Sequence, residues 1–182
     1  MTERVIVAGF GGQGILFLGR LLAQIGMDRG SHVTFFPAYG PEVRGGRANC
    51  HVIISSDAIF SPRIDVADAA LAMNQISWDY FAGRVRPDGL AVVNASMTEV
   101  EDNTGPERLI RVPATDLASE LGDVRATNMV MLGAYNHARQ LFPLDVLLDD
   151  LRGMLGRSKA ALFELNRAAI QRGIDSAEAQ IG

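Results

Sequence analysis

The sequence predicts an α/β fold of the Rossmann-like type, with a mostly parallel sheet, helices on both faces and a helical C-terminal third. Three observations carry this prediction. Short β-branched segments alternate with longer segments whose apolar residues recur at helical spacing. The strand segments are continuously apolar, which is typical of parallel strands buried on both faces. A glycine-rich segment, Gly9 to Gly14, joins the first strand to the first helix.

The first half of the fold begins with a strand and a helix, and two further strands follow. These elements are predicted at Arg4–Ala8, Ile15–Arg29, His32–Phe36 and Cys50–Ser55. Gly30 follows the helix as a stop signal, and Pro37 closes the second strand because it cannot donate to a sheet ladder. No helix separates the second strand from the third, so this part of the sheet is expected to be antiparallel.

The second half of the chain contains three more strands and ends in three helices. The predicted elements are a strand at Ala69–Met73, a helix at Gln75–Val85, strands at Gly89–Asn94 and Leu109–Ala114, and helices at Thr127–Leu141, Leu144–Leu155 and Ser158–Gln171. Thr127 or Asn128 is expected to cap the first of the terminal helices. No internal repeat or linker interrupts the sequence, so residues 1–182 are taken as one domain.

Composition places the chain among globular proteins and excludes several functional classes. Hydrophobic residues make up 48% and charged residues 21% of the 182 residues, unlike a disordered chain. The formal net charge of −4 argues against a general nucleic-acid binder, which carries a basic surface. The one cysteine, Cys50, cannot by itself form a disulfide, an iron–sulfur cluster or a four-cysteine zinc site, and it is predicted to be a buried thiol.

The N-terminal segment lacks the features of a signal peptide. Glu3 lies where a basic region is needed, Gln13 interrupts the apolar run, and no small-residue cleavage site follows. No uninterrupted apolar run approaches the length needed to cross a bilayer. We therefore expect no membrane association and a cytoplasmic location.

The first glycine-rich segment matches a phosphate-binding motif. Gly9, Gly11 and Gly14 have the spacing G-x-G-x-x-G directly after a strand and at the start of a helix. In this motif the first glycine permits a tight turn, the second lets the backbone approach a phosphate, and the third lets helix and strand pack closely. We assign Gly9, Gly11, Gly12, Gln13 and Gly14 as candidate cofactor-binding residues. The alternative is a turn that only packs the helix on the sheet.

A nicotinamide dinucleotide is disfavoured as the ligand of this loop. The dinucleotide fingerprint requires an Asp or Glu at the end of the second strand, where it binds the ribose hydroxyls. Phe35, Phe36, Pro37 and Ala38 occupy that place in this chain.

A second glycine-rich segment, AYGPEVRGGRAN, runs from Ala38 to Asn49 after the second strand. A glycine pair can form a nest of N–H groups for an anion, and arginine offers two parallel donors to a phosphate. The further candidate binding residues are Tyr39, Gly40, Glu42, Arg44, Gly45 and Gly46, together with Asn74 after the fourth strand. The alternative is a solvated turn with ordinary surface arginines. No residue is assigned as catalytic or as a metal ligand.

The motifs GFGGQG, YGPEVRGG, ANCHVIIS and AMNQ together resemble the gamma subunit of the 2-oxoacid:ferredoxin oxidoreductases, most of all the 2-oxoglutarate or branched-chain type. The resemblance covers nearly the whole chain, including VPATDLASELG and NMVMLGAY. It implies a complex that decarboxylates a 2-oxoacid on thiamine diphosphate, passes electrons through iron–sulfur clusters to ferredoxin, and transfers the acyl group to coenzyme A.

The resemblance also implies how this work is divided among subunits. The chain has neither the thiamine motif G-D-G-x-N nor a C-x-x-C, so those cofactors are expected on alpha and beta subunits, with a ferredoxin-like delta subunit left open. No cofactor is expected to bind this chain tightly. A gamma subunit is left to pack against its partners and to help hold coenzyme A. The phosphates of coenzyme A suit a glycine loop and arginines with no acidic ribose contact, because an acid at that place would repel the 3′-phosphate.

Two other classes of function stay open beside this one. The first is a purely structural subunit whose glycine loops contact no cofactor. The second is a stand-alone nicotinamide-dependent oxidoreductase, which the missing acid disfavours. The isolated chain is expected to be inactive, and to cover its apolar surface on partner subunits or by forming a homodimer.

Overall fold

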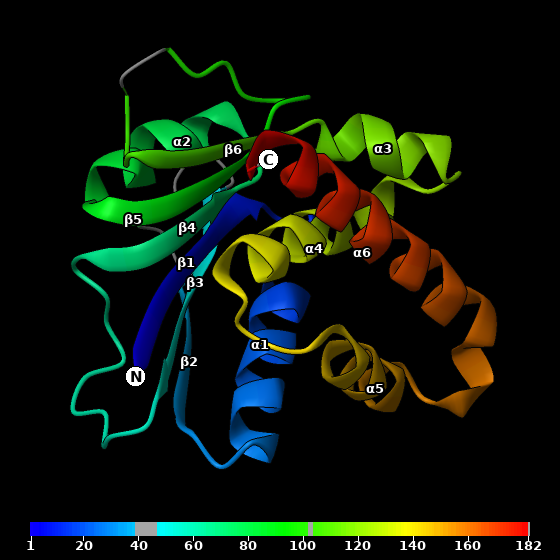
Figure 1. Ribbon diagram of the computed structural model, residues 1–182, viewed down its shortest axis with the longest axis horizontal. Helices are drawn as coiled ribbons and strands as arrows, with labels where there is room; N and C mark the ends of the chain where they lie inside the picture. The colour runs from blue at the N-terminus through cyan, green and yellow to red at the C-terminus, as the bar shows by residue number, and fades with distance from the viewer. Residues whose placement is uncertain (39–46, 102–103, 182) are drawn as a thin grey trace.

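The computed structural model describes residues 1–38, 47–101 and 104–181, and these form a six-stranded sheet with helices packed against it (Figure 1). The strands lie side by side in the order β2-β3-β1-β4-β5-β6. Their bounds are Thr2–Phe10 (β1), His32–Ala38 (β2), Arg47–Ser55 (β3), Ala67–Ala72 (β4), Val85–Asn94 (β5) and Arg108–Val112 (β6).

The sheet is mostly parallel, as predicted. β1 pairs with β4, β4 with β5, and β5 with β6 in parallel. β3 runs antiparallel to both of its neighbours, β1 and β2. The antiparallel part expected from the missing helix between β2 and β3 is therefore confirmed.

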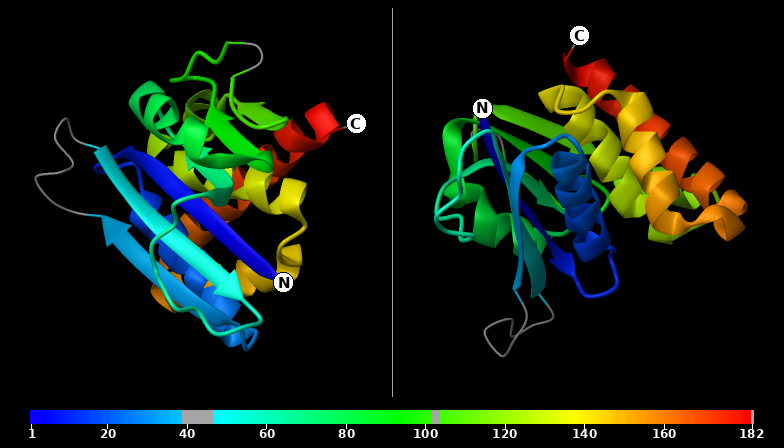
Figure 2. Two further views of the ribbon diagram at one scale, coloured as in Figure 1. Left: turned by 90° about the vertical axis from the view of Figure 1, so that its left-hand side faces the viewer. Right: turned by 90° about the horizontal axis from the view of Figure 1, so that it is seen from below.

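The helices cover the two faces of the sheet unequally. Their bounds are Ile15–Asp28 (α1), Gln75–Phe81 (α2), Ala114–Glu120 (α3), Thr127–Arg139 (α4), Leu144–Leu155 (α5) and Ala160–Ile181 (α6). α1, α4, α5 and α6 lie on one face and α2 lies on the other (Figures 1 and 2). The larger apolar core, which includes Leu18 and Leu132, fills the first face, while Ile6 and Phe81 belong to a smaller cluster on the second. Every residue of β4 is buried between these layers, in agreement with its apolar run Ala69–Ala72, and the buried Asp68 pairs with Arg4 and Arg86.

The helix after β4 is shorter than the predicted Gln75–Val85. α2 ends at Phe81, and a 3-10 turn, Ala82–Arg84, leads into the next strand. Val85 pairs with Ala67 as the first residue of β5. Val85 therefore joins the sheet by pairing with β4. The helical spacing of apolar residues, from which the helix was predicted, does not report such a pairing.

Helix α3 was missed by the sequence analysis. The strand predicted at Leu109–Ala114 ends at Val112, and α3 begins at Ala114 with Pro113 in the capping position. Proline removes a donor from a sheet ladder but is tolerated where a helix begins. Pro113 therefore marks the change from strand to helix.

Helix α6 continues to Ile181, beyond the predicted end at Gln171. Gly173 lies inside it, although glycine is a poor helix former. A Cβ at Gly173 would overlap the backbone of Val130 on α4, so the glycine permits a close crossing of the two helices. Packing against α4 outweighs the unfavourable propensity. Within the described ranges, no helix has both the length and the apolar character needed to span a membrane.

Candidate functional site

The carboxyl ends of parallel strands bring polar segments to one edge of the sheet. β1 and β4 pair in register, with Ala8 opposite Ala72, so the segments that follow these strands begin side by side. From β1 the chain proceeds to β2 and β3 on one side, and from β4 it proceeds to β5 and β6 on the other. Open α/β sheets bind ligands at such a point of reversal in strand order.

The loop between β1 and α1 presents open backbone at this edge. Gly12 has φ 90° and Gly14 has φ 71°, in the left-handed region that glycine favours. Gly11 and Gly12 are exposed, and a Cβ at either position would meet no atom within 4 Å. The first turn of α1 contains no acidic residue and has no side-chain cap. The N–H groups at the start of this helix therefore suit an anion.

Gly9 has a different role from the one expected of the first glycine of the motif. It lies within β1, before the turn. A Cβ at Gly9 would lie 2.7 Å from Gln13 Oε1 and 3.0 Å from the Cβ of Met73. Gly9 is thus required for close packing against the end of β4, and the left-handed turn depends on Gly12 and Gly14.

Gln13 and Asn74 brace the glycine loop. Gln13 Oε1 accepts hydrogen bonds from the Phe10 N–H at 2.7 Å and from Asn74 Nδ2 at 3.0 Å. Asn74 is 2% exposed and also caps α2, where its Oδ1 accepts the Ser77 N–H at 3.0 Å. Both predicted residues lie at the site and hold its shape. Their direct contact with a cofactor stays a prediction.

Asn128 supports the glycine loop from α4, whereas the sequence suggested a helix-capping role for it. The expectation that Thr127 or Asn128 caps α4 is wrong, because α4 has no side-chain cap and Thr127 Oγ1 donates to the Val124 carbonyl at 2.6 Å. Asn128 Nδ2 donates to the Gly14 carbonyl at 3.0 Å, and its side chain fills the space that a Cβ at Gly14 would need. Asn128 and Gly14 are 114 positions apart in the chain, so local sequence patterns cannot predict this contact.

Asn94 ties three elements together at the same edge. Its Nδ2 donates to the Met73 carbonyl at 3.1 Å and to Thr115 Oγ1 at 2.9 Å, and its Oδ1 accepts the Ala114 N–H at 3.1 Å. The ends of β4 and β5 and the start of α3 are thereby held together. Asn94 is fully buried, so these bonds also satisfy its amide.

The second predicted loop lies outside the described residues. Its candidates are Tyr39, Gly40, Glu42, Arg44, Gly45 and Gly46, and their role in binding stays a prediction. The positions on either side are described: Ala38 ends β2, and Arg47 begins β3 opposite Phe10, the last residue of β1. The chain therefore enters β3 beside the start of the first glycine loop.

Cys50 and the end of β2 agree with what the sequence predicts for them. Cys50 is fully buried, and burial raises the pKa of its thiol to about 12, which confirms the predicted buried thiol. β2 ends in Phe36, Pro37 and Ala38, without the acid of the dinucleotide fingerprint. In the part of the chain that the structure describes, no group of three or more His, Cys, Asp or Glu side chains is arranged to hold a metal ion.

The fold and the loop define a Rossmann-like α/β protein with a glycine-rich turn at the switch point of its sheet. The chain belongs to the pyruvate ferredoxin/flavodoxin oxidoreductase family, whose sequence model matches residues 4–176. The resemblance found in the sequence motifs is thereby confirmed at the level of the family.

Two relatives from Methanothermobacter marburgensis are similar to this chain in sequence. Ketoisovalerate oxidoreductase subunit VorA is 45% identical over 130 residues, which are 71% of this chain and 27% of VorA. The chain therefore spans about a quarter of the length of that relative. 2-Oxoglutarate synthase subunit KorC is 31% identical over 145 residues, which cover 76% of this chain and 78% of KorC.

Two solved structures share the fold. The gamma subunit of a keto/oxoacid ferredoxin oxidoreductase from Geobacter sulfurreducens superposes with a TM-score of 0.83 and 25% identity, over 97% of this chain and 99% of that one. The 2-oxoglutarate:ferredoxin oxidoreductase from Magnetococcus marinus, solved with 2-oxoglutarate, coenzyme A and succinyl-CoA bound, superposes with a TM-score of 0.82 and 26% identity. That match covers 98% of this chain and 31% of the other.

Proposed function

We propose that this chain is the gamma subunit of a 2-oxoacid:ferredoxin oxidoreductase, and that its glycine loop helps to hold coenzyme A. The observation that carries the proposal is the open backbone at Gly11 and Gly12, at the N-terminus of α1 and at the switch point of the sheet. Family membership and the Geobacter gamma subunit support the assignment to this class of complex.

The chemistry of coenzyme A fits the residues of the site. Its pyrophosphate and 3′-phosphate carry negative charge, which the N-terminus of α1 and the arginines of the second loop would stabilise. An acid at the end of β2 would repel the 3′-phosphate, and none stands there. The bound coenzyme A in the Magnetococcus relative supports this choice of ligand.

The redox chemistry belongs to partner subunits in this proposal. The chain has one cysteine and no thiamine motif, so alpha and beta subunits would hold thiamine diphosphate and the iron–sulfur clusters. Those groups supply decarboxylation of the 2-oxoacid and single-electron transfer to ferredoxin. The residues of this chain would bind and orient coenzyme A. A cytoplasmic location, a ferredoxin-like delta subunit and a homodimer of the isolated chain stay predictions.

The 2-oxoacid substrate is proposed to be 2-oxoglutarate, as the motifs indicate. Similarity to KorC, over most of both chains, supports this choice. The higher identity to VorA favours a branched-chain 2-oxoacid as the second candidate. Assaying the assembled complex with 2-oxoglutarate and with 2-oxoisovalerate decides between the two.

The proposed contact with coenzyme A is tested by Gly11→Val in the assembled complex. Gly11 has open space around its Cβ position and is not left-handed, so the fold tolerates a side chain that blocks the approach of a phosphate. We expect the coenzyme A concentration for half-maximal rate to rise about tenfold or more, with little change for the 2-oxoacid. Gly12→Val is a poorer choice because φ 90° would add backbone strain.

The matched control is Gly83→Val. Gly83 is also exposed and has open space at its Cβ position, and it precedes β5 at the opposite edge of the sheet. Arg44→Ala tests the second loop in the same assay. The proposal is wrong if Gly11→Val and Arg44→Ala leave the coenzyme A dependence at the level of the control while both variants keep their thermal stability.

A purely structural subunit is the alternative function. The observation in its favour is that the side chains of Gln13 and Asn74 are already bonded within the protein. In that case Gly11→Val and Arg44→Ala would weaken subunit assembly without changing the coenzyme A requirement of the complex that does assemble. A stand-alone nicotinamide enzyme is disfavoured by the end of β2, and titration with NAD and NADP tests it directly.

A further inference from the structure

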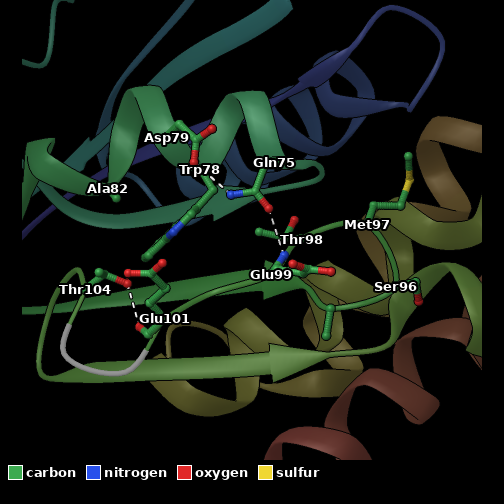
Figure 3. A pocket seen from close by; sticks show the side chains of 11 residues that line it. Gln75, Trp78, Asp79, Ala82, Ser96, Met97, Thr98, Glu99, Glu101 and Thr104 are labelled. Carbon is green, nitrogen blue, oxygen red and sulfur yellow. Dashed lines mark hydrogen bonds between the residues drawn. The ribbon is translucent and has the colours of Figure 1, made fainter.

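A groove beside the glycine loop has no part in the proposed function. It lies between α2 and the described residues 95–101 and 104 that follow β5, is open to solvent, and has a volume of about 930 Å³ (Figure 3). Trp78 and Ala82 contribute apolar surface to it. Met97, which is 42% exposed, also lines it, and its sulfur accepts a hydrogen bond from Gln13 Nε2 at 3.6 Å. The groove therefore adjoins the glycine loop.

Negative charge is concentrated on both walls of this groove. Asp79 projects from α2, and Glu99 and Glu101 come from the facing segment (Figure 3). All three are exposed, and none forms a salt bridge with a cation in residues 1–38, 47–101 or 104–181. Three neighbouring carboxylates without a counter-ion among the described residues favour a cationic ligand.

The walls of the groove are held in place before any ligand arrives. The Gln75 N–H donates to the Met97 carbonyl at 3.1 Å, and Gln75 Oε1 accepts the Glu99 N–H at 2.8 Å. Gln75 Nε2 donates to Asp79 Oδ1 at 2.8 Å. The first two bonds join α2 to the facing segment, and the third holds Asp79 in place within α2, so the groove is a preformed surface.

One buried polar group on the lining is unsatisfied. Thr98 is 7% exposed, and its hydroxyl has no hydrogen-bond partner among the described residues. Buried hydroxyls are nearly always hydrogen-bonded, because an unmet hydroxyl costs free energy. A polar group brought in by a bound chain would supply that partner.

We propose that this groove receives an arginine- or lysine-bearing segment of another subunit of the complex. The methylene groups of such a side chain would lie along Trp78 and Ala82, while its charged end meets the three carboxylates. An extended segment also has the size for an open groove of this volume. The inference rests on the proposed function, because it requires the chain to assemble with other subunits.

The test is the double charge reversal Glu99→Lys/Glu101→Lys, mixed with the purified partner subunits. Both positions are exposed, so we expect folding to be unaffected, and a thermal melt of the variant checks this. We expect association with the partners to weaken roughly tenfold or more at low salt, and the salt dependence of association to decrease. The control Asp149→Lys/Glu178→Lys makes the same charge change at exposed positions on α5 and α6, and should alter association less than about twofold.

Hydrogen exchange of the assembled complex locates the contact independently. We expect the segment 95–101 and α2 to be protected on assembly, and carbodiimide to cross-link Glu99 or Glu101 where the partner segment carries lysine. Unchanged association of the double variant, or no protection at the groove, overturns the docking proposal alone. The docking proposal is also overturned if a small polyamine slows hydrogen exchange at the groove and the partner subunits do not. In that case the groove binds a small cation. If the unmodified chain associates with no partner subunit, the proposed function itself fails.

Discussion

At the scale of single residues, a buried carboxylate fastens the first strand to helix α4. Glu3 is 1% exposed, and it accepts hydrogen bonds from the Tyr135 hydroxyl at 2.8 Å and from Arg139 Nε at 2.9 Å. Arg139 also pairs with Glu3 through its Nη2. Burial, aided by the negative charge of Glu3, raises the pKa of Tyr135 well above its usual value, so the hydroxyl stays a donor.

Tyr135→Phe should lower the free energy of unfolding by about 1.5–3 kcal/mol. The change keeps the ring in the core but removes a hydrogen bond to a charged, buried group. Urea unfolding of the purified chain measures the difference. Tyr80→Phe, at a residue that is 47% exposed, serves as the control and should change stability by less than about 0.5 kcal/mol. Equal effects of the two substitutions would contradict a special role for the Glu3 contact.

At the scale of elements, the crossing of α4 and α6 depends on two glycines. A Cβ at Gly133 would overlap the backbone of Ile170, and one at Gly173 would overlap the backbone of Val130. The two helices therefore approach each other backbone to backbone. Such close packing leaves no room for the smallest side chain unless one helix moves.

Gly133→Ala should destabilise the protein by about 1–3 kcal/mol, because overpacking forces the two helices apart. Gly153→Ala is the matched control. Gly153 lies inside α5, is exposed, and has open space at its Cβ position, so alanine there should stabilise by up to about 1 kcal/mol. Thermal unfolding of both variants provides the comparison. If Gly133→Ala and Gly153→Ala destabilise the protein equally, the close approach of α4 and α6 at Gly133 does not limit side-chain size.

At the scale of the whole molecule, the candidate site and the groove lie at one edge of the sheet, and exposed apolar side chains lie away from it. The glycine loop, the bracing amides and the carboxylate-lined groove all lie at the carboxyl ends of parallel strands. Exposed apolar side chains occur elsewhere, including Phe60 at 99% and Val66 at 58% exposure. Apolar surface of this kind is often covered by another chain.

The isolated chain should show no turnover of 2-oxoglutarate with coenzyme A and a redox dye. The reason is that the sequence lacks the motifs for thiamine diphosphate and for iron–sulfur clusters. Adding the purified partner subunits should produce activity that requires this chain. Turnover by the chain alone would show that it carries catalytic groups which neither the motifs nor the described residues reveal.

Several features of this protein follow from local sequence alone. Continuous β-branched runs such as that of β1, and the absence of a helix before β3, determine the mostly parallel sheet and its antiparallel part, since both signals act over a few residues. The run of glycines between Gly9 and Gly14 likewise predicts that a glycine turn joins β1 to α1, although the turn itself uses Gly12 and Gly14. These predictions hold because strand character and glycine turns depend on short-range backbone preferences.

Other features were decided only by the tertiary structure. Asn128 supports the loop from α4, Gly9 packs against Met73, and Val85 joins the sheet instead of extending α2. The carboxylates of the groove come from α2 and from the segment after β5, which only the pairing of β4 with β5 brings together. Each of these outcomes depends on contacts between residues far apart in the chain, and local propensity and spacing contain no information about such contacts.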